Sequence, residues 1–78
     1  MNNNFKKCIN AKSDEELISI IAEEYIDKGL TKDELFKAGR RGIEKAHKNH
    51  ETSNSFLFNA FAVWWVRQSM LAAIESKK

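Results

Sequence analysis

The sequence predicts a small all-α domain of three helices, and three observations support this prediction. The 78-residue chain contains no proline and only three glycines, so few residues interrupt a helix. Capping boxes, in which a Ser or Thr and a Glu three residues later satisfy each other's backbone amides, mark helix starts at Ser13 and Thr31. Apolar residues recur three or four positions apart, which places them on one side of a helix.

The first predicted helix covers residues 14–28. Ser13 is its N-cap, and Glu16 stands at the third helical position of the capping box. Apolar side chains then recur at helical spacing, and Gly29 supplies a stop at the C-terminal end. These apolar residues are Leu17, Ile20, Ile21 and Tyr25.

The second predicted helix covers residues 32–49 and begins at the capping box of Thr31 and Glu34. Gly39 and Gly42 allow another helix to approach closely, at a cost in helix propensity of about 1 kcal/mol each. They share one side of the helix with apolar residues, namely Leu35, Phe36, Ile43 and Ala46. The opposite side is expected to face solvent and carries Lys37, Arg40 and Arg41.

The third predicted helix covers residues 54–75, after several N-cap candidates between positions 51 and 55. At about 100° per residue, it presents two separate apolar faces. The predicted core face consists of Phe58, Ala62, Val66, Ser69 and Ala73, with Met70 at its edge. The second face consists of Phe61, Trp64, Trp65, Gln68 and Ala72.

The second face of the third helix holds both tryptophans of the chain. Its rings either pack on the second helix and the N-terminal segment, or form an exposed binding surface. An exposed aromatic surface beside basic residues suits unpaired nucleic-acid bases, because every base offers a face for stacking.

The domain is expected to span residues 13–78, with residues 1–12 as an N-terminal arm for which disorder is an open alternative. Cys8 has no second cysteine with which to form an internal disulfide. The N-terminal segment lacks the apolar run of a signal peptide, and no stretch approaches the ~20 apolar residues that span a bilayer. We therefore expect a cytoplasmic protein.

Charge is distributed unevenly along the chain. Residues 14–27 contain six acidic and no basic residues, whereas residues 32–48 contain six basic and three acidic ones. Such runs are usually solvated faces. Here the two helices can also attract each other, or the basic one can face a polyanion.

The sequence offers little for catalysis or metal binding, so no enzyme, metal or cofactor is expected. His47, His50 and Glu51 lie close in sequence, but there is neither a paired-cysteine spacing nor an HExxH motif. We expect both histidines to be solvated near a helix end. The third helix has too few basic residues for a membrane-surface helix, since Arg67 is its only one before the C-terminus.

The segment "FNAFAVWWVRQSMLAAI" resembles the promoter-melting and recognition helix of the sigma-70 family of bacterial RNA polymerase sigma factors. The family pattern is Phe-Ser-Thr-Tyr-Ala-x-Trp-Trp-Ile-Arg-Gln-Ala-Ile. It is matched by Phe58, Phe61, Ala62, Trp64, Trp65, Val66, Arg67 and Gln68. Residues 18–46 resemble the preceding part of the same domain, sigma region 2. The landmarks there are Tyr25, Gly29, Leu30, Glu34, Leu35, Gly39, Gly42, Lys45 and Ala46.

This resemblance implies a DNA-binding site that captures the non-template strand of the minus-ten promoter element. Phe61 would stack on an extruded adenine, Trp64 would wedge where the duplex opens, and Trp65 would support it. Gln68 would reach a base edge, and Arg67 belongs to the same DNA-binding set.

The chain departs from the family pattern at positions that contact DNA. Ala60 and Leu71 stand where the family has threonine, and Ala72 stands where it has arginine. Leu57 replaces a residue that is commonly basic. Each change removes a hydrogen bond or a phosphate contact, and phosphate contacts dominate affinity.

The resemblance also implies a polymerase-binding face on the second helix. In the family this face is neutral to acidic and docks on a basic coiled coil of the largest polymerase subunit. Here it is more basic, and like charges across an interface can cost several kcal/mol. The corresponding positions are Glu34, Lys37, Ala38, Arg40 and Glu44.

Two functions remain open from the sequence. One is a DNA-binding module of transcription initiation that engages the single-stranded minus-ten element and core RNA polymerase. The other is a sigma-domain mimic that regulates RNA polymerase or a sigma factor through protein contacts, without reading promoters. The retained aromatic residues favour the first.

Overall fold

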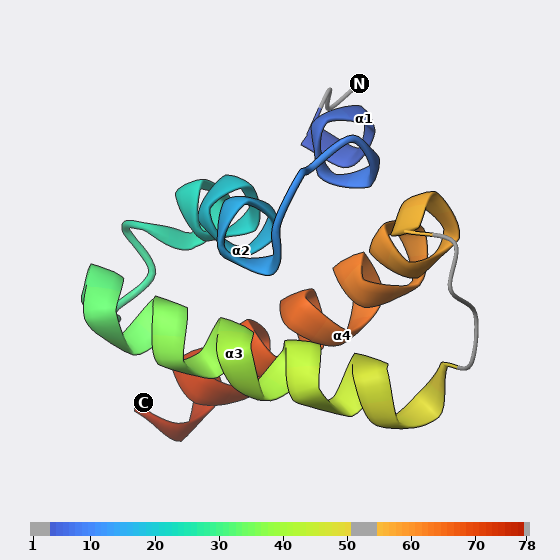
Figure 1. Cartoon of the computed structure of the whole chain (residues 1–78). Coiled ribbons are helices and arrows are strands. Elements are labelled where there is room, and N and C mark those ends of the chain that lie inside the picture. The colour runs from blue at the N-terminus through green and yellow to red at the C-terminus, as the bar shows by residue number, and fades with distance from the viewer. Residues whose placement is uncertain (1–3, 51–54, 78) are drawn as a thin grey trace.

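The computed structural model describes residues 4–50 and 55–77, and this part of the chain is helical, with no β-strand. The helices are α1 (Asn4–Ile9), α2 (Asp14–Ala22), the 3-10 turn η1 (Glu23–Tyr25), α3 (Lys32–Asn49) and α4 (Ser55–Ser76). Figure 1 shows α2 beside α3, α4 crossing α3, and α1 near the first turns of α4. The all-α prediction is confirmed.

Both predicted helix starts are confirmed by their hydrogen bonds. The Ser13 hydroxyl accepts from the Glu16 backbone amide at 3.1 Å, but the Glu16 carboxylate accepts from the Lys12 amide at 2.7 Å and not from that of Ser13, so only half of the predicted capping box forms there. Thr31 Oγ1 accepts from the Glu34 amide at 3.1 Å, and Glu34 Oε1 accepts from the Thr31 amide at 2.8 Å. The N-cap candidates at 51–54 lie outside the described residues.

The first predicted helix is shorter than expected. It was expected to reach residue 28, but α2 ends at Ala22 and continues as the tighter turn η1. Glu24 lies in this turn, and its carboxylate is held by side chains of α4 and α1. The chain then reverses at Gly29, whose φ of 109° suits a residue without a side chain.

The expected N-terminal arm differs from the structure, because residues 4–9 form α1, which packs on α2 and α4. Cys8 on this helix is fully buried. The buried Asn59 side chain donates to the carbonyls of Ile9 at 3.3 Å and Ala11 at 3.0 Å. These bonds satisfy backbone groups that a short helix leaves open at its end, which ties the segment to the domain.

The buried side of α4 lies a little to one side of the predicted core face. Ser69 and Ala73 are only half-buried, whereas Val63 and Ile74 are buried. This rotation arises because α1 and α2 pack against α4 in addition to α3. The buried residues of α4 include Phe58, Ala62, Val63, Val66, Met70 and Ile74.

Gly42 sets the distance between α3 and α4. A Cβ atom at this position would lie 2.7 Å from the Trp65 carbonyl oxygen and 2.7 Å from Val66 Cα. The expected close approach at the glycines is therefore confirmed, since no side chain fits between these backbones. This contact fixes the backbone of α4 at the paired tryptophans.

Candidate nucleic-acid interface

The outward side of α4 carries the site predicted from the aromatic residues. The Trp64 side chain is 57% exposed, and Gln68 one turn later is also exposed. Phe61 and Trp65 are half-buried and pack against the core. The structure thus combines the two interpretations, because two rings pack inward while Trp64 faces solvent.

Trp64 is supported from one side by its neighbour. The Trp64 and Trp65 rings meet edge to face, with centroids 5.1 Å apart and planes 89° apart. Phe61 lies 6.1 Å from Trp65 at a tilt of 60°. These separations are typical of favourable aromatic pairs. Because the backbone of Trp65 is held against Gly42, the aromatic group is anchored to α3.

The aromatic contacts continue to the histidines at the end of α3. His50 lies 4.6 Å from Phe61 and 5.9 Å from Phe58, whereas His47 stacks on Phe58 at 4.3 Å. His47 is exposed as expected, and its Nε2 lies 3.1 Å from Asp14 Oδ2. His50 is half-buried against rings, which differs from the solvated position expected for it.

Arg67 is directed away from the aromatic group, toward α2 and η1. Its guanidinium donates through Nη1 and Nη2 to both carboxylate oxygens of Glu24, the second at 3.0 Å. Asn4 also donates to this carboxylate at 2.8 Å. Burial acts to lower the pKa of Arg67, but the hydrogen bonds and charge of Glu24 and Tyr25 outweigh it and leave the pKa raised. Of the predicted DNA-binding set, Arg67 is thus the one committed to an internal ion pair.

The predicted polymerase-binding set is not one continuous surface. Lys37, Arg40 and Glu44 are exposed, in agreement with the solvent-facing side expected for α3. Ala38 differs, since it is fully buried in the core and cannot contact a partner. Arg40 donates to Glu15 on α2 at 3.3 Å, so the acidic and basic helices do attract each other locally.

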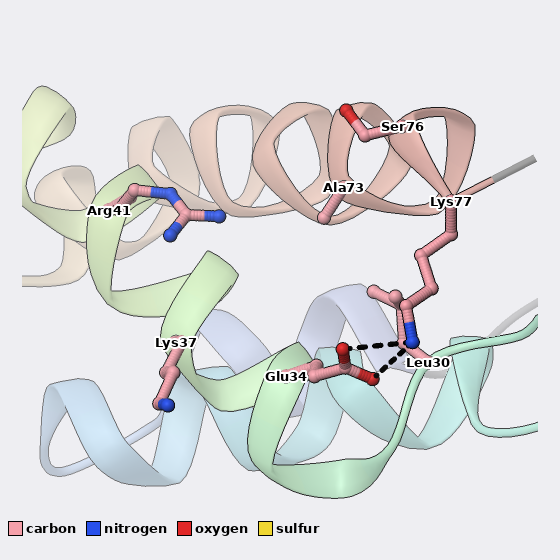
Figure 2. Close-up of a pocket in the computed structure, with 7 residues that line it drawn as sticks. All are labelled: Leu30, Glu34, Lys37, Arg41, Ala73, Ser76 and Lys77. Atoms are coloured by element: carbon pink, nitrogen blue, oxygen red, sulfur yellow. Dashed lines mark hydrogen bonds and ion pairs between the residues drawn. The ribbon is translucent and has the colours of Figure 1, made fainter.

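The remaining residue of that set, Glu34, lies at a pocket of about 340 Å³ between the start of α3 and the end of α4. In Figure 2, Lys77 extends from the end of α4 to the Glu34 carboxylate, which it meets at 3.0 Å. The pocket is lined by Leu30, Glu34, Lys37, Arg41, Ala73, Ser76 and Lys77. It is basic overall, and the sequence did not indicate it because Lys77 lies far from α3 along the chain.

The described residues offer neither a metal site nor a membrane-spanning helix. Within 4–50 and 55–77, no group of three His, Cys, Asp or Glu side chains is placed to hold a metal ion. Glu51, which the sequence places beside the histidines, lies outside these ranges. In the same ranges, no helix has the length and apolar character needed to cross a membrane.

Taken together, these features define a helical domain with an aromatic group on one helix and a basic exposed side on another. Over comparable segments, the chain is similar to RNA polymerase sigma factors. It is 32% identical over 65 residues to SigA4 of Synechococcus elongatus, covering 83% of this chain and 21% of that protein. It is 31% identical over 64 residues to SigA of Listeria monocytogenes, covering 82% and 17% respectively. It is 31% identical over 70 residues to SigA of Lactococcus lactis subsp. cremoris, covering 90% of this chain and 19% of that protein.

These similarities support the interpretation of the chain as a fragment of the sigma-70 family. The chain spans about one fifth of the length of these curated relatives. No family model matches the chain, and no solved structure matches it.

Proposed function

We propose that the chain is a DNA-binding module of transcription initiation that resembles sigma region 2 and engages the single-stranded minus-ten promoter element. The observation that carries this proposal is the exposure of Trp64 on a rigid aromatic support. A large ring left 57% exposed does little for the core, but it offers a surface on which a base can stack.

The arrangement of the other rings suits capture of unpaired bases rather than duplex DNA. Trp65 lies edge to face with Trp64, the half-buried Phe61 packs on Trp65, and the exposed Gln68 one turn after Trp64 supplies a donor and an acceptor for a base edge. Extruding a base costs a few kcal/mol, which an aromatic site recovers by stacking. Because Arg67 is neutralised by Glu24, little of the affinity is expected to come from that residue's charge.

The second part of the proposal concerns core RNA polymerase, which this chain would contact through Glu34, Lys37, Arg40 and Glu44. The positive charges of Lys37 and Arg40 in this set predict weak association with a polymerase whose docking coiled coil is itself basic. Changing Lys37→Gln and Arg40→Asn together is expected to strengthen that association, measured by pull-down with purified core enzyme. Tight binding that these changes leave unaltered would contradict the charge argument.

A second candidate function is a regulator that contacts polymerase or a sigma factor and does not read promoters. The ion pair of Arg67 and Glu24 favours it, because a basic residue of the proposed DNA-binding set is occupied internally. This function predicts no preference for minus-ten-like single strands over other DNA.

The test is a binding titration of labelled single-stranded minus-ten-like DNA and of the matching duplex over a series of salt concentrations. We expect the single strand to bind more tightly, and Trp64→Ala to weaken its binding by about 1–3 kcal/mol with the helical content unchanged. Ile26→Ala is the matched control, since Ile26 is a large apolar residue that is 48% exposed and belongs to no part of α4. Equal binding of single strand and duplex, unaffected by Trp64→Ala, would favour the regulator.

A further inference from the structure

The basic pocket between the start of α3 and the end of α4 is separate from the aromatic group. Phe61, Trp64 and Trp65 do not line it. Its volume of about 340 Å³ lies within the range of small-molecule sites in proteins. The pocket is therefore large enough to hold a small organic ligand.

Two basic side chains at this pocket have no counter-charge. Lys37 and Arg41 are both exposed, and no other described residue forms an ion pair or a hydrogen bond with either side chain. By contrast, Arg40, Arg67 and Lys77 each form an ion pair with a glutamate. Lys37 and Arg41 thus remain available to an anionic ligand.

The spacing of these two cations favours a ligand with two negative charges. Lys37 and Arg41 lie four residues apart, on one side of α3 and about 6 Å apart along its axis. Like charges at this spacing repel each other, and a dianion between them removes that repulsion. A phosphate monoester carries nearly two negative charges at pH 7, and a guanidinium can hold two of its oxygens at once. In Figure 2, Arg41 extends from α3 toward α4.

The other end of the pocket offers hydrogen-bond acceptors. The Glu34 carboxylate lies there and is neutralised by Lys77 at 3.0 Å, so it does not cancel the charge of Lys37 and Arg41 (Figure 2). Ser76 is the last residue of α4, where backbone carbonyls lack helical partners. This end suits the hydroxyl or amino groups of an organic ligand. Leu30 and Ala73 add apolar surface to the lining.

We propose that this pocket binds a small phosphate monoester of the nucleotide class, with its phosphate held by Lys37 and Arg41 and its hydroxyl or amino groups near Glu34. Glu34 and Lys37 also belong to the proposed polymerase-binding set, so an occupied pocket would change the charge presented to polymerase. That consequence rests on the proposed function, whereas binding of the ligand does not.

The test is a nuclear magnetic resonance titration of the full chain with adenosine monophosphate at constant ionic strength. We expect saturable shifts of backbone amides at residues 30–41 and 73–77. Arg41→Gln should raise the dissociation constant roughly tenfold, because a charge-assisted contact is lost. Arg40→Gln is the matched control, since it removes the same charge from α3 but Arg40 binds Glu15 and does not line the pocket. No saturable binding at millimolar ligand, or an equal loss in both variants, overturns the proposal.

Three further probes identify which part of the ligand is recognised. Inorganic phosphate and adenosine should each bind more weakly than adenosine monophosphate, because each lacks one half of it. Dimethyl phosphate carries a single charge, like a link of a nucleic-acid backbone, and should bind more weakly than inorganic phosphate. Dimethyl phosphate that binds as tightly as adenosine monophosphate would assign the pocket to a nucleic-acid backbone, and adenosine that does so would exclude phosphate recognition. Either result overturns the proposal.

These titrations contain neither DNA nor polymerase, so their failure leaves the proposed function untouched. Conversely, a chain that binds adenosine monophosphate but has no affinity for single-stranded DNA would count against the proposed function alone.

Discussion

The substitution Gly42→Ala tests the close packing that holds α4 in place. The added Cβ would lie 2.7 Å from both the Trp65 carbonyl oxygen and Val66 Cα, and 3.0 Å from Ser69 Oγ. Two of these atoms belong to backbone, so they move only if the helices separate. Overpacking of this kind costs about 1–3 kcal/mol. Since backbone atoms yield less readily than side chains, the cost should lie in the upper part of that range, about 2–3 kcal/mol. Alanine recovers about 1 kcal/mol of helix propensity, so the net loss should be roughly 1–2 kcal/mol.

Gly39→Ala is the matched control on the same side of α3. Its added Cβ would meet side-chain atoms only, Ile18 Cγ2 at 2.6 Å and Met70 Cε at 3.2 Å. Side chains can shift more readily than backbone, so this variant should be less destabilised than Gly42→Ala. Urea unfolding followed by circular dichroism measures both, and about 1 kcal/mol corresponds to ~4–8 °C in melting temperature. A Gly42→Ala protein as stable as the parent would refute the argument that backbone contact fixes α4.

Three further predictions concern the charged and buried groups. Glu24→Gln should lower the free energy of unfolding by about 1–3 kcal/mol, because the half-buried Arg67 loses its counter-charge; an unchanged urea midpoint would contradict this. Burial raises the pKa of Cys8 from 9.0 to about 11, so a thiol reagent at pH 8 should modify it only after unfolding. The folded chain keeps this proton above pH 9 where the unfolded chain loses it, so stability should fall between pH 9 and about 11, and less steeply in Cys8→Ala. The hydrogen bond from the Thr31 backbone amide holds the pKa of Glu34 below 4.5. The contribution of Glu34 to the free energy of unfolding should therefore be present at neutral pH and be lost as the pH falls below about 4.5. Glu34→Gln should not show this loss.

The features that could be predicted from the sequence depend on local signals. Caps at Ser13 and Thr31 act within a few residues, so both helix starts were predictable, whereas the end of α2 at Ala22, ahead of the stop expected at Gly29, was not. Helix α1 was not, because a six-residue helix is stable only through distant contacts such as Asn59, which lies 48 and 50 residues from the carbonyls it binds.

The candidate site was predictable in its residue types and less so in its partners. Two apolar faces on one helix left exposure of the second face as one of two alternatives, and the structure shows it for Trp64 but not for Phe61 or Trp65. The core face was predicted with a small rotational error, because a helix that is apolar on both sides does not fix which side is buried. The capture of Arg67 by Glu24, 43 residues earlier, depends on the tertiary fold and has no local signal.

The central claim is that the exposed ring of Trp64 receives an unpaired base, and nuclear magnetic resonance tests it most directly. The chain has two indole N–H signals, from Trp64 and Trp65. Addition of single-stranded minus-ten-like DNA is expected to shift the Trp64 signal strongly, through the ring current of a stacked base, and the Trp65 signal less. Shifts confined to Lys37, Arg40 and Arg41 on α3, with the Trp64 signal unmoved, would contradict the claim.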